Sequence, residues 1–546
     1  MQMLQAPAPV PRTRILARIV IAVLAFLAYL PALAGGYVYD DHRFVEENTA
    51  LDSFTPMLYF TDPSTVAEES WEGIYRPLRT LDFAIDRAIA GNTPFFPHLR
   101  NLLYHLAGAL LVYGLIRRLL DSDAAAFYGA LAFALHPVHT ESVAWITSRA
   151  DAMVLVAFLG ALILHLDGRR RLAAGVLVLA LFSKEAAVVF PGAVLLADRL
   201  RGERIRLGWT AIYGGLCAGY TVFWFFFLGG GEMAGFGHLD SWWGGSYGAN
   251  LLTMSRGFLY YLSELLFPVA LVIDYHVPAT PALDAGSAIG IVAVVAIGIA
   301  SVFAGPRARF AFLWFFVLLL PVSNLLRPIG IPTAERFLYL PSIGIAVWAA
   351  PYLARTRLTV AVLACFFALT AVRCLDWQTD EKLFASAARV TETPRSLGHL
   401  ADAALGRAHE ELDAAREAGP VRGREHEARA RKYARETIRH ADALVALHRD
   451  QIRLPVGRIG AAALSQKANA LVILGDYEAA LAAADASILA YPELPYSWFN
   501  AALALEKLGR YAEAARNCEK AMELGYEDSD LTPIIRDLRR MAGTRR

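Results

Sequence analysis

The sequence predicts an all-α protein in which a polytopic helical membrane domain precedes a soluble array of helical repeats. The chain is 56% hydrophobic and only 19% charged, which is too apolar for a soluble protein of several domains. The charges are also unevenly spread. They make up about 14% of residues 1–377 and about 30% of residues 378–546. The third observation is a period of 34 residues in the charged part, which is typical of helical repeats. We therefore expect a membrane domain at 1–375 and a repeat domain at 376–546.

Composition also excludes two classes of protein. The net charge is +1, whereas a nucleic-acid-binding protein usually carries a large basic excess. The chain has four cysteines, which are too few for a disulfide scaffold in 546 residues. Two of them lie in apolar runs, where buried thiols are the expected state.

Apolar runs of roughly the length needed to cross a bilayer begin near the N-terminus. We predict eleven spans, at 15–34, 99–116, 123–138, 150–166, 172–184, 186–198, 209–228, 284–304, 310–325, 335–353 and 358–373. The stretch 251–273 is also apolar, but Arg256, Glu264 and Pro268 interrupt it. We therefore expect it to be re-entrant or interfacial.

Arginine clusters orient these spans, because cytoplasmic loops are enriched in basic residues. The arginine clusters lie next to the predicted spans, at 12–18, 117–118, 169–171, 199–206, 307–309 and 355–357. All of them fall on one side only if 251–273 does not cross fully. The N-terminus is then cytoplasmic. The segments 35–98, 137–149, 183–187, 229–283 and 326–335 lie on the opposite, outer face, together with the tail.

The first apolar run has two interpretations. It ends in Ala32-Leu33-Ala34, which resembles a signal-peptidase site. We favour an uncleaved first span, and the remaining topology is the same in either case.

The tail contains recurring residues 34 positions apart. Gly475, Tyr477 and Ala480 recur as Gly509, Tyr511 and Ala514. These residue types match the tetratricopeptide (TPR) repeat, with the best units at 461–494 and 495–528 and a degenerate unit within 385–445. The alternative is a generic helical hairpin. Repeat arrays of this kind form concave surfaces that hold extended peptides or partner proteins.

Charged residues near apolar segments indicate functional sites by default, and here they gather on the outer face. Directly after the first span come Asp40 and Asp41, followed by His42. Adjacent carboxylates repel each other, so that one of them can hold a raised pKa and act as a base. A solvated turn or a helix cap explains the pair equally well.

The next outer-face motifs contain Arg76, Arg79 and His98. The two arginines are three residues apart and can share one helical face, where two guanidinium groups would hold a phosphate. Interfacial arginines that reach toward lipid headgroups are the alternative.

The string LHPVHTESVAWITSRAD carries His136, His139, Glu141, Arg149 and Asp151. The first three are weak candidates for metal ligands, because Pro137 breaks the helix between them. Hydrogen bonding to a substrate, or packing of the loop, is the favoured interpretation. Arg149 and Asp151 are expected to pair with each other.

Two further motifs place cations beside apolar runs. Lys184 is followed by Glu185, and the two residues form either a mutual salt bridge or a lysine site for a lipid phosphate. Arg336 opens a span from the outer side, where an anionic headgroup would lie. Three more residues are candidates for lining the same cavity: Asp274, Glu335 and Tyr339.

The order of these motifs resembles a known family. YDDH, RPL, HPVHTE with a following RAD, SKE, AERFLYLPSIG and a repeat tail are similar to the TMTC protein O-mannosyltransferases of the GT-C glycosyltransferase superfamily. The resemblance covers nearly the whole chain. HPVHTE…RAD and ERFLYLPSIG are its specific strings. The alanine- and arginine-rich composition favours a bacterial member, with a periplasmic outer face in place of the endoplasmic reticulum lumen.

The resemblance implies transfer of a sugar, mannose or another hexose, from a polyprenyl-phosphate carrier to a hydroxyl group, with inversion. Asp40 would be the base, with Asp41 as helper or alternative. Lys184 and Arg336, with Arg76 as a further candidate, would stabilise the leaving phosphate. A Ser or Thr of a polypeptide held by the repeats is the expected acceptor. No cofactor is firmly implied, and dependence on a divalent metal stays open.

Three other functions compete with this interpretation. The chain could transfer sugar to a glycan or lipid, transport a lipid-linked sugar, or serve as a non-enzymatic scaffold. A transporter predicts polar residues throughout the bilayer depth and an inverted repeat, and neither is visible in the sequence. A scaffold leaves the outer-face string of acids and cations unexplained.

Overall fold

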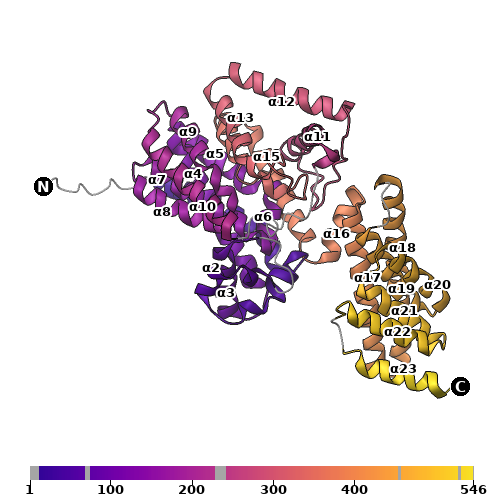
Figure 1. Ribbon diagram of the computed structural model, residues 1–546. Coiled ribbons are helices and arrows are strands. Elements are labelled where there is room, and N and C mark those ends of the chain that lie inside the picture. The colour runs from indigo at the N-terminus through magenta and orange to yellow at the C-terminus, as the bar shows by residue number, and fades with distance from the viewer. Residues whose placement is uncertain (1–11, 68–73, 228–241, 453–456, 527–529, 545–546) are drawn as a thin grey trace. The chain divides into compact units, whose positions relative to one another are not determined.

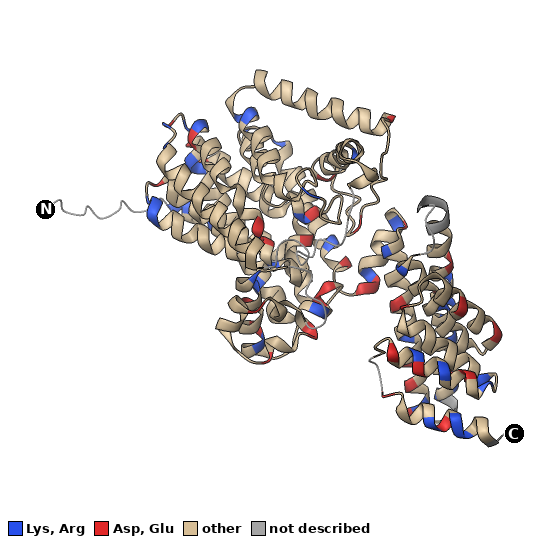
Figure 2. Cartoon of the chain, in the orientation of Figure 1, with Lys and Arg blue, Asp and Glu red and all other residues tan. Residues whose placement is uncertain are grey.

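The computed structural model describes residues 12–67, 74–227, 242–452, 457–526 and 530–544. The chain divides into two compact units, Met1–Thr379 and Asp380–Arg546. The described residues are helical and contain no β-strand, which confirms the predicted all-α class. Figure 2 shows a first unit whose helices are mostly free of charge and a second unit with charged residues along many of its helices.

The first unit contains fifteen α-helices among its described residues. They are α1 (Arg12–Tyr29), α2 (Pro56–Thr61), α3 (Pro77–Ala90), α4 (Phe95–Leu120), α5 (Asp123–Leu135), α6 (Thr140–Ala144), α7 (Arg149–Leu166), α8 (Arg170–Ser183), α9 (Phe190–Leu200), α10 (Leu207–Phe227), α11 (Tyr247–Leu266), α12 (Ala285–Phe303), α13 (Pro306–Leu319), α14 (Ser342–Leu353) and α15 (Leu358–Asp376). Short 3₁₀ or π turns join several of them, including η1 (Leu30–Ala34), η2 (His42–Glu46), η5 (Pro137–His139), η6 (Ile146–Ser148), η7 (Glu185–Val189) and η10 (Glu335–Leu338).

Among the described residues of this unit, six helical segments are long and apolar enough to cross a bilayer. They are Arg12–Ala34, Phe95–Leu120, Ile146–Leu166, Leu207–Phe227, Ala285–Phe303 and Leu358–Asp376. Two shorter apolar helices, α5 and α14, lie among them. The chain is therefore a multi-pass membrane protein. Helix α11 covers much of the interrupted stretch 251–273 but ends at Leu266, and it is not among the six.

The helices of the first unit pack around α4. This helix contacts α1, α5 and α7, while α5 also packs against α14 and α15. Helices α11, α12 and α13 follow one another as neighbours on another side of the unit (Figure 1). Close approach is possible where residues are small. A Cβ on Gly290 of α12 would lie 2.2 Å from the Ser255 carbonyl oxygen of α11.

The segment between α1 and α4 forms a small helical layer with its own apolar core. Phe44, Tyr59, Val66 and Phe83 are buried there together, and Ile146 of η6 joins them. This layer lies beneath α6 in Figure 1. The layer is contacted by η6, by α8 and, through the ion pair of Arg76 with Glu185, by η7.

The start of this layer is tied to the end of the unit. Gly36 donates its backbone N–H to the Gln378 carbonyl, at 3.0 Å. The Gln378 side chain donates in turn to the Pro31 carbonyl, at 3.2 Å. The Trp377 ring stacks on Trp145, with 6.0 Å between centroids. The last residues of the first unit therefore hold the chain that leads from the first span to Asp40.

The second unit is a series of helices in which each helix packs against the next one in sequence. They are α16 (Asp380–Val390), α17 (Pro394–Glu417), α18 (Pro420–Ile452), α19 (Arg458–Leu474), α20 (Tyr477–Ala490), α21 (Pro495–Lys507), α22 (Tyr511–Glu523) and α23 (Thr532–Thr544). The period of 34 appears in the helix starts, because α20 begins at Tyr477 and α22 at Tyr511. Gly475 and Gly509 make the two turns with φ of 86° and 76°, a left-handed conformation that favours glycine.

Candidate active site

The aspartate pair lies at a strained point of the backbone. Tyr39 has φ of 56°, which is uncommon for a residue other than glycine and often marks a functional site. The π-helical turn η2 begins directly after Asp41, and such turns are also frequent at functional sites. The sequence therefore holds the two carboxylates in a conformation that an ordinary helix or turn would not provide.

The two aspartates have different surroundings. Asp41 is 0% exposed. Its Oδ1 accepts from the N–H and the Oγ1 of Thr147, at 2.7 and 2.6 Å, and its Oδ2 accepts from the Val38 N–H at 3.2 Å. Burial raises the pKa of Asp41 to about 7, although these hydrogen bonds oppose the shift. Asp40 is only half-buried.

The partners of the cationic residues lie on one segment, 141–151. Lys184 Nζ donates to Asp151 Oδ1 at 2.5 Å. Arg336 donates to Glu141 through its guanidinium and also through its backbone N–H, at 2.8 Å to Oε2. Because Thr147 holds Asp41, this single segment brings the aspartate pair together with both cations. We use the name ion-pair cluster for the three pairs Lys184–Asp151, Arg336–Glu141 and Arg76–Glu185.

Arg76 and Glu185 complete the ion-pair cluster. The Arg76 Nη2 and Nε donate to the two carboxylate oxygens of Glu185, at 2.7 and 3.1 Å. Burial opposes both charges, but Glu185 raises the pKa of Arg76 and Arg76 lowers the pKa of Glu185 to about 2. Both groups are therefore charged at neutral pH. The expected Lys184–Glu185 pair is wrong, because each of these residues pairs across the fold.

Aromatic rings connect the ion-pair cluster to the aspartate pair. The Arg336 guanidinium lies 5.2 Å from the ring centroid of Trp145, a cation–π distance. Trp145 also contacts the Tyr39 ring, with 5.7 Å between centroids. Tyr39 immediately precedes Asp40, so the rings of Trp145 and Tyr39 connect Arg336 to the aspartate pair.

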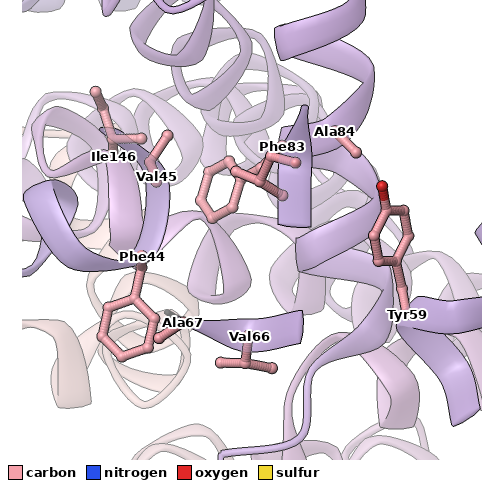
Figure 3. Packing of buried hydrophobic residues seen from close by; sticks show 9 residues of the cluster. Phe44, Val45, Tyr59, Val66, Ala67, Phe83, Ala84 and Ile146 are labelled. Carbon is pink, nitrogen blue, oxygen red and sulfur yellow. The ribbon is translucent and has the colours of Figure 1, made fainter. Parts of the chain in front are cut away.

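Arg79 differs from the other cations of this region. It is 1% exposed, and its guanidinium lies over the rings of Phe44 and Phe83 at 4.9 and 5.8 Å. Figure 3 shows both phenylalanines in the apolar core of the helical layer between α1 and α4. Among the described residues no carboxylate forms an ion pair with Arg79, and its Nε has no hydrogen-bond partner. Burial, followed by Arg76, lowers the pKa of Arg79 to about 9, while Glu185 and Asp40 oppose that shift.

Arg149 has a structural role. It is fully buried and donates to Asp82, Asp86, Asn101 and the Pro97 carbonyl. The expected pair between Arg149 and Asp151 is therefore wrong. Every edge of this guanidinium is occupied, and it ties α3 to α4 and α7.

The histidines predicted as metal ligands are engaged in other contacts. His136 bonds the Leu265 carbonyl and the Val138 N–H, at 3.1 and 3.2 Å. His139 bonds the Phe133 carbonyl and Ser342 Oγ, at 2.8 and 3.0 Å. With Glu141 held by Arg336, these residues form no ligand cluster, and no group of three potential ligands occurs among the described residues. These contacts are those of loop packing, one of the two favoured interpretations, and a metal role for His136, His139 and Glu141 stays an untested prediction.

The remaining predicted residues lie around this centre. His42 pairs with Glu46 at 2.5 Å on the half-exposed turn η2. His98 is buried and donates to the Gly36 carbonyl, at 3.2 Å. Tyr339 donates to the buried His105, at 2.6 Å. Glu335 accepts from Tyr275 at 3.1 Å and from Arg373 at 3.5 Å, and Asp274 is half-buried beside Tyr275.

Sequence reasoning missed several residues that shape the site. Thr147 and Trp145 lie within the quoted HPVHTE…RAD string, but a threonine and a tryptophan carry no charge that would single them out. Arg373 lies at the end of a predicted span and pairs with Glu335. Its position after an apolar run was the available signal.

Several protein O-mannosyl-transferases are similar to the chain, although no protein-family model matches it. Protein O-mannosyl-transferase F38B6.6 of Caenorhabditis elegans is 26% identical over 71% of this chain and 60% of its own length. Human protein O-mannosyl-transferase TMTC4 is 26% identical over 68% of the chain and 62% of its own length. Protein O-mannosyl-transferase Tmtc2 of Drosophila melanogaster is 35% identical over 33% of the chain and 21% of its own length.

The chain thus spans less than two thirds of the length of these curated relatives. Among solved structures, ArnT from Cupriavidus metallidurans bound to undecaprenyl phosphate is similar with a TM-score of 0.41 and 14% identity. That match covers 91% of this chain and 79% of the ArnT chain. By its sequence, this chain is a relative of the TMTC protein O-mannosyl-transferases.

Proposed function

We propose that the chain is a membrane glycosyltransferase that moves a hexose from a polyprenyl-phosphate carrier to a hydroxyl group of a polypeptide. The observation that carries the proposal is the convergence of Asp40, Asp41 and the ion-pair cluster on the segment 141–151. An acid–base group beside buried cations is the equipment that transfer from a phosphate carrier needs. The relatives are named protein O-mannosyl-transferases, which suggests the sugar and the acceptor class.

Asp40 is the base in this proposal, and Asp41 is a positioning residue. A general base must come within hydrogen-bond reach of the acceptor hydroxyl. Asp41 is fully buried and already accepts three hydrogen bonds, whereas Asp40 is half-buried on the same turn. Asp40 takes the proton as the acceptor oxygen bonds to the anomeric carbon, and the bond from that carbon to the phosphate oxygen breaks. A single displacement of this kind inverts the anomeric centre.

The leaving phosphate gains negative charge and requires cations nearby. Lys184, Arg336 and Arg76 are the candidates from the sequence, and each is already paired with a carboxylate. A phosphate would share these cations with their partners. Arg79 is the stronger candidate, because it is buried without an ion pair and the Asp40 charge acts on it. A phosphate would compensate a cation that is costly to bury alone.

The isoprenoid tail of the donor requires an apolar groove next to this centre. Helices α11, α12 and α13 enclose two adjoining apolar cavities of about 440 and 280 Å³, which share Phe258 and Phe316. The first reaches Tyr261 and Thr333, close to the loop that ends in Arg336. We assign the tail to these cavities, with α11 as their wall.

The compartment and the role of the repeats are part of the same proposal. We place the active site and the repeats on the outer face of a bacterial inner membrane, with a cytoplasmic N-terminus. In a eukaryotic cell the same face is the lumen of the endoplasmic reticulum. The repeats then present a polypeptide to the site.

The test uses Asp40→Asn in the full-length protein, with a radiolabelled polyprenyl-phosphate hexose. We expect transfer to fall at least a hundredfold, the range of general-base catalysis, while the donor still binds. Glu47→Gln, on the exposed end of the same turn, is the matched control and keeps full activity. Unchanged transfer by Asp40→Asn would contradict the proposed base. Movement of labelled lipid without transfer would favour a transporter, and label on a glycan or lipid would replace the polypeptide acceptor.

A further inference from the structure

A separate cavity of about 320 Å³ lies between the C-terminal end of α9 and the N-terminal end of α13. Its walls combine two arginines with apolar side chains and include Arg199, Arg309, Leu196, Leu200 and Phe310. None of these residues belongs to the candidate active site or to the cavities assigned to the donor tail. The cavity therefore requires an explanation of its own.

The two helices run antiparallel, which places this cavity away from the ion-pair cluster. At the other end of the helix pair, a Cβ on Gly192 of α9 would lie 2.8 Å from Cγ1 of Val317 of α13. Glu185, the partner of Arg76, precedes α9 at that end. Helix α9 has 11 residues and rises about 1.5 Å per residue, so it separates the cavity from η7 by about 16 Å.

The cavity lies at a boundary of the membrane. Helix α12, a candidate span, ends at Phe303, and α13 begins shortly afterwards at Pro306. Helix α10, another candidate span, begins at Leu207, a short loop after α9 ends at Leu200. Phe303 and Leu207 are 85% and 73% exposed, as expected of apolar side chains that face lipid. The ends of α9 and α13 therefore lie at the level of the lipid headgroups.

The two arginines of the cavity have charges that no carboxylate compensates. Arg201, which follows closely on α9, pairs with Glu203 at 2.9 Å. Within the part of the chain that the structure describes, Arg199 and Arg309 form neither an ion pair nor a side-chain hydrogen bond. Two guanidinium groups on one cavity are thus available to a phosphate, which accepts hydrogen bonds from arginine with high strength.

The first turn of α13 adds positive potential to the same cavity. Its N-cap is Gly305, which has no side chain to accept a hydrogen bond from the turn. Pro306 occupies the next position and is exposed at the cavity. The backbone N–H groups of Arg307 and Ala308 are therefore left for an anion, and the helix dipole favours negative charge at this end.

The apolar walls select a lipid over a free anion. Leu196, Leu200 and Phe310 line the same cavity as the arginines. A hydrated free phosphate gains nothing from such walls, whereas acyl chains are stabilised when they leave water. Basic pockets between membrane helices bind the headgroups of anionic lipids. The ligand that combines a phosphate with acyl chains at this level is a phospholipid.

We propose that Arg199, Arg309 and the N-terminus of α13 form a binding site for one anionic phospholipid. Its phosphate lies between the two guanidinium groups, and its acyl chains lie along the apolar walls. In the proposed orientation the lipid belongs to the cytoplasmic leaflet, opposite the active site. The phospholipid site is independent of the proposed transferase activity, because none of its residues touches the donor site.

The experiment measures lipid selectivity by native mass spectrometry of the full-length protein. The probes are phosphatidylglycerol and phosphatidylcholine with identical acyl chains. The wild-type protein should bind one phosphatidylglycerol at least tenfold more tightly than phosphatidylcholine. Arg199→Gln and Arg309→Gln should each reduce this preference about fivefold, because each removes one cation from the headgroup region. Arg309→Lys keeps the charge and should retain much of the preference.

Arg357→Gln is the matched control. Arg357 is exposed, belongs to an arginine cluster predicted for the same face and does not line the cavity. This variant should keep the wild-type preference. An equal loss in Arg199→Gln, Arg309→Gln and Arg357→Gln would indicate general attraction to a basic surface and would overturn the site. Equal binding of the two lipids by the wild-type protein would overturn it as well.

Competition identifies the source of the phosphate. Inorganic phosphate should leave the bound phosphatidylglycerol in place, and its displacement would replace the lipid site by a free-anion site. Polyprenyl phosphate that displaces phosphatidylglycerol at substoichiometric amounts would assign the cavity to the carrier lipid and overturn the phospholipid.

Thermal unfolding gives a second readout that does not depend on the gas phase. Phosphatidylglycerol should raise the thermal midpoint of the wild-type protein more than that of Arg199→Gln, because a ligand stabilises the folded state to which it binds. Without added lipid the two midpoints should agree, since Arg199 is exposed and forms no ion pair among the described residues. The same rise in both proteins would contradict the phospholipid site.

Discussion

At the scale of single residues, the buried carboxylate of Asp41 makes the stability of the first unit depend on pH. Burial raises the pKa of Asp41 to about 7, although its hydrogen bonds to Thr147 and Val38 oppose the shift. An ordinary unfolded carboxyl titrates near 4, so the folded state binds this proton more tightly. The corresponding stabilisation is present below pH 4 and is lost as the pH rises toward 7.

We expect the thermal midpoint of the purified protein to fall between pH 4.5 and pH 7 by more in the wild type than in Asp41→Asn. The amide cannot ionise, so the variant lacks this source of pH dependence. The contribution is on the order of 4 kcal/mol at most, from about three pKa units at about 1.4 kcal/mol each. Asp62→Asn, at a half-buried carboxylate of the same layer that accepts from Ser64, is the control. Parallel midpoint curves for wild type and Asp41→Asn would show that the burial of Asp41 does not control stability.

Two buried arginines, Arg79 and Arg149, should respond in opposite ways to replacement by methionine. Arg79→Met should leave the thermal midpoint unchanged or raised, because it removes a buried cation without an ion pair and keeps the apolar stem over Phe44. If Arg79 holds the donor phosphate, the affinity for the donor should fall tenfold or more. Donor titration and thermal unfolding of the same samples check both expectations.

Arg149→Met should instead destabilise the fold by about 3–5 kcal/mol, because Asp82 and Asp86 lose a buried partner. Arg100 also pairs with Asp82 and Asp86, so it still compensates part of their negative charge in this variant. Equal destabilisation by Arg79→Met and Arg149→Met would assign Arg79 to the structure and remove it from the donor site.

The charged residues of the site could be predicted from the sequence, whereas the contacts between them could not. Asp40, Lys184 and Arg336 were recognisable because charges beside apolar runs are costly and rare. The pairing among them was not, because Lys184 reaches Asp151 and Arg76 reaches Glu185 across more than thirty and one hundred residues of chain. Opposite charges that are close in sequence, Lys184 with Glu185 and Arg149 with Asp151, are not paired with each other in the fold.

At the scale of elements, the approach of α11 to α12 determines the width of the apolar cavity. Gly290 permits this approach, because a Cβ there would meet the Ser255 carbonyl oxygen at 2.2 Å. The Ser255 hydroxyl also donates to the Ser287 carbonyl, at 3.0 Å. Small residues at such crossings are typical of helices packed in membranes.

Gly290→Ala should therefore push α11 away from α12 and cost about 1–3 kcal/mol, the usual cost of overpacking. We expect weaker donor binding, measured by titration, together with a lower thermal midpoint. Gly219→Ala on α10 is the control, because a Cβ there meets nothing within 4 Å. Donor binding that is the same in both variants would argue against α11 as a wall of the donor cavity.

The helical elements were predictable to different degrees. Long spans such as α4 and α12 stand out because about 20 apolar residues in a row have few other uses. The helix starts at Tyr477 and Tyr511 repeat the period of 34 found in the sequence. The π turn η2 and the left-handed Tyr39 were not predictable, because local strain depends on contacts such as that of Asp41 with Thr147.

At the scale of the whole molecule, the two units should be separable in function. Deletion of Asp380–Arg546 removes the repeats at the boundary between the compact units. If the repeats present the acceptor, transfer to protein should fall by tenfold or more while hydrolysis of the donor falls by less than twofold. Both products are quantified from the same labelled donor.

The thermal midpoint of the shortened protein is the control for this deletion, because the first unit has its own core and should stay folded. Equal losses of transfer and hydrolysis, with an unchanged midpoint, would remove the repeats from acceptor presentation.

The hydrogen bonds of Gln378 with Gly36 and Pro31 have a mechanical consequence. The repeats begin two residues after Gln378, so a pull on them reaches α15 through the backbone and the segment before Asp40 through these two hydrogen bonds. A load on the tail would therefore be shared between the last span and the segment that carries the proposed base.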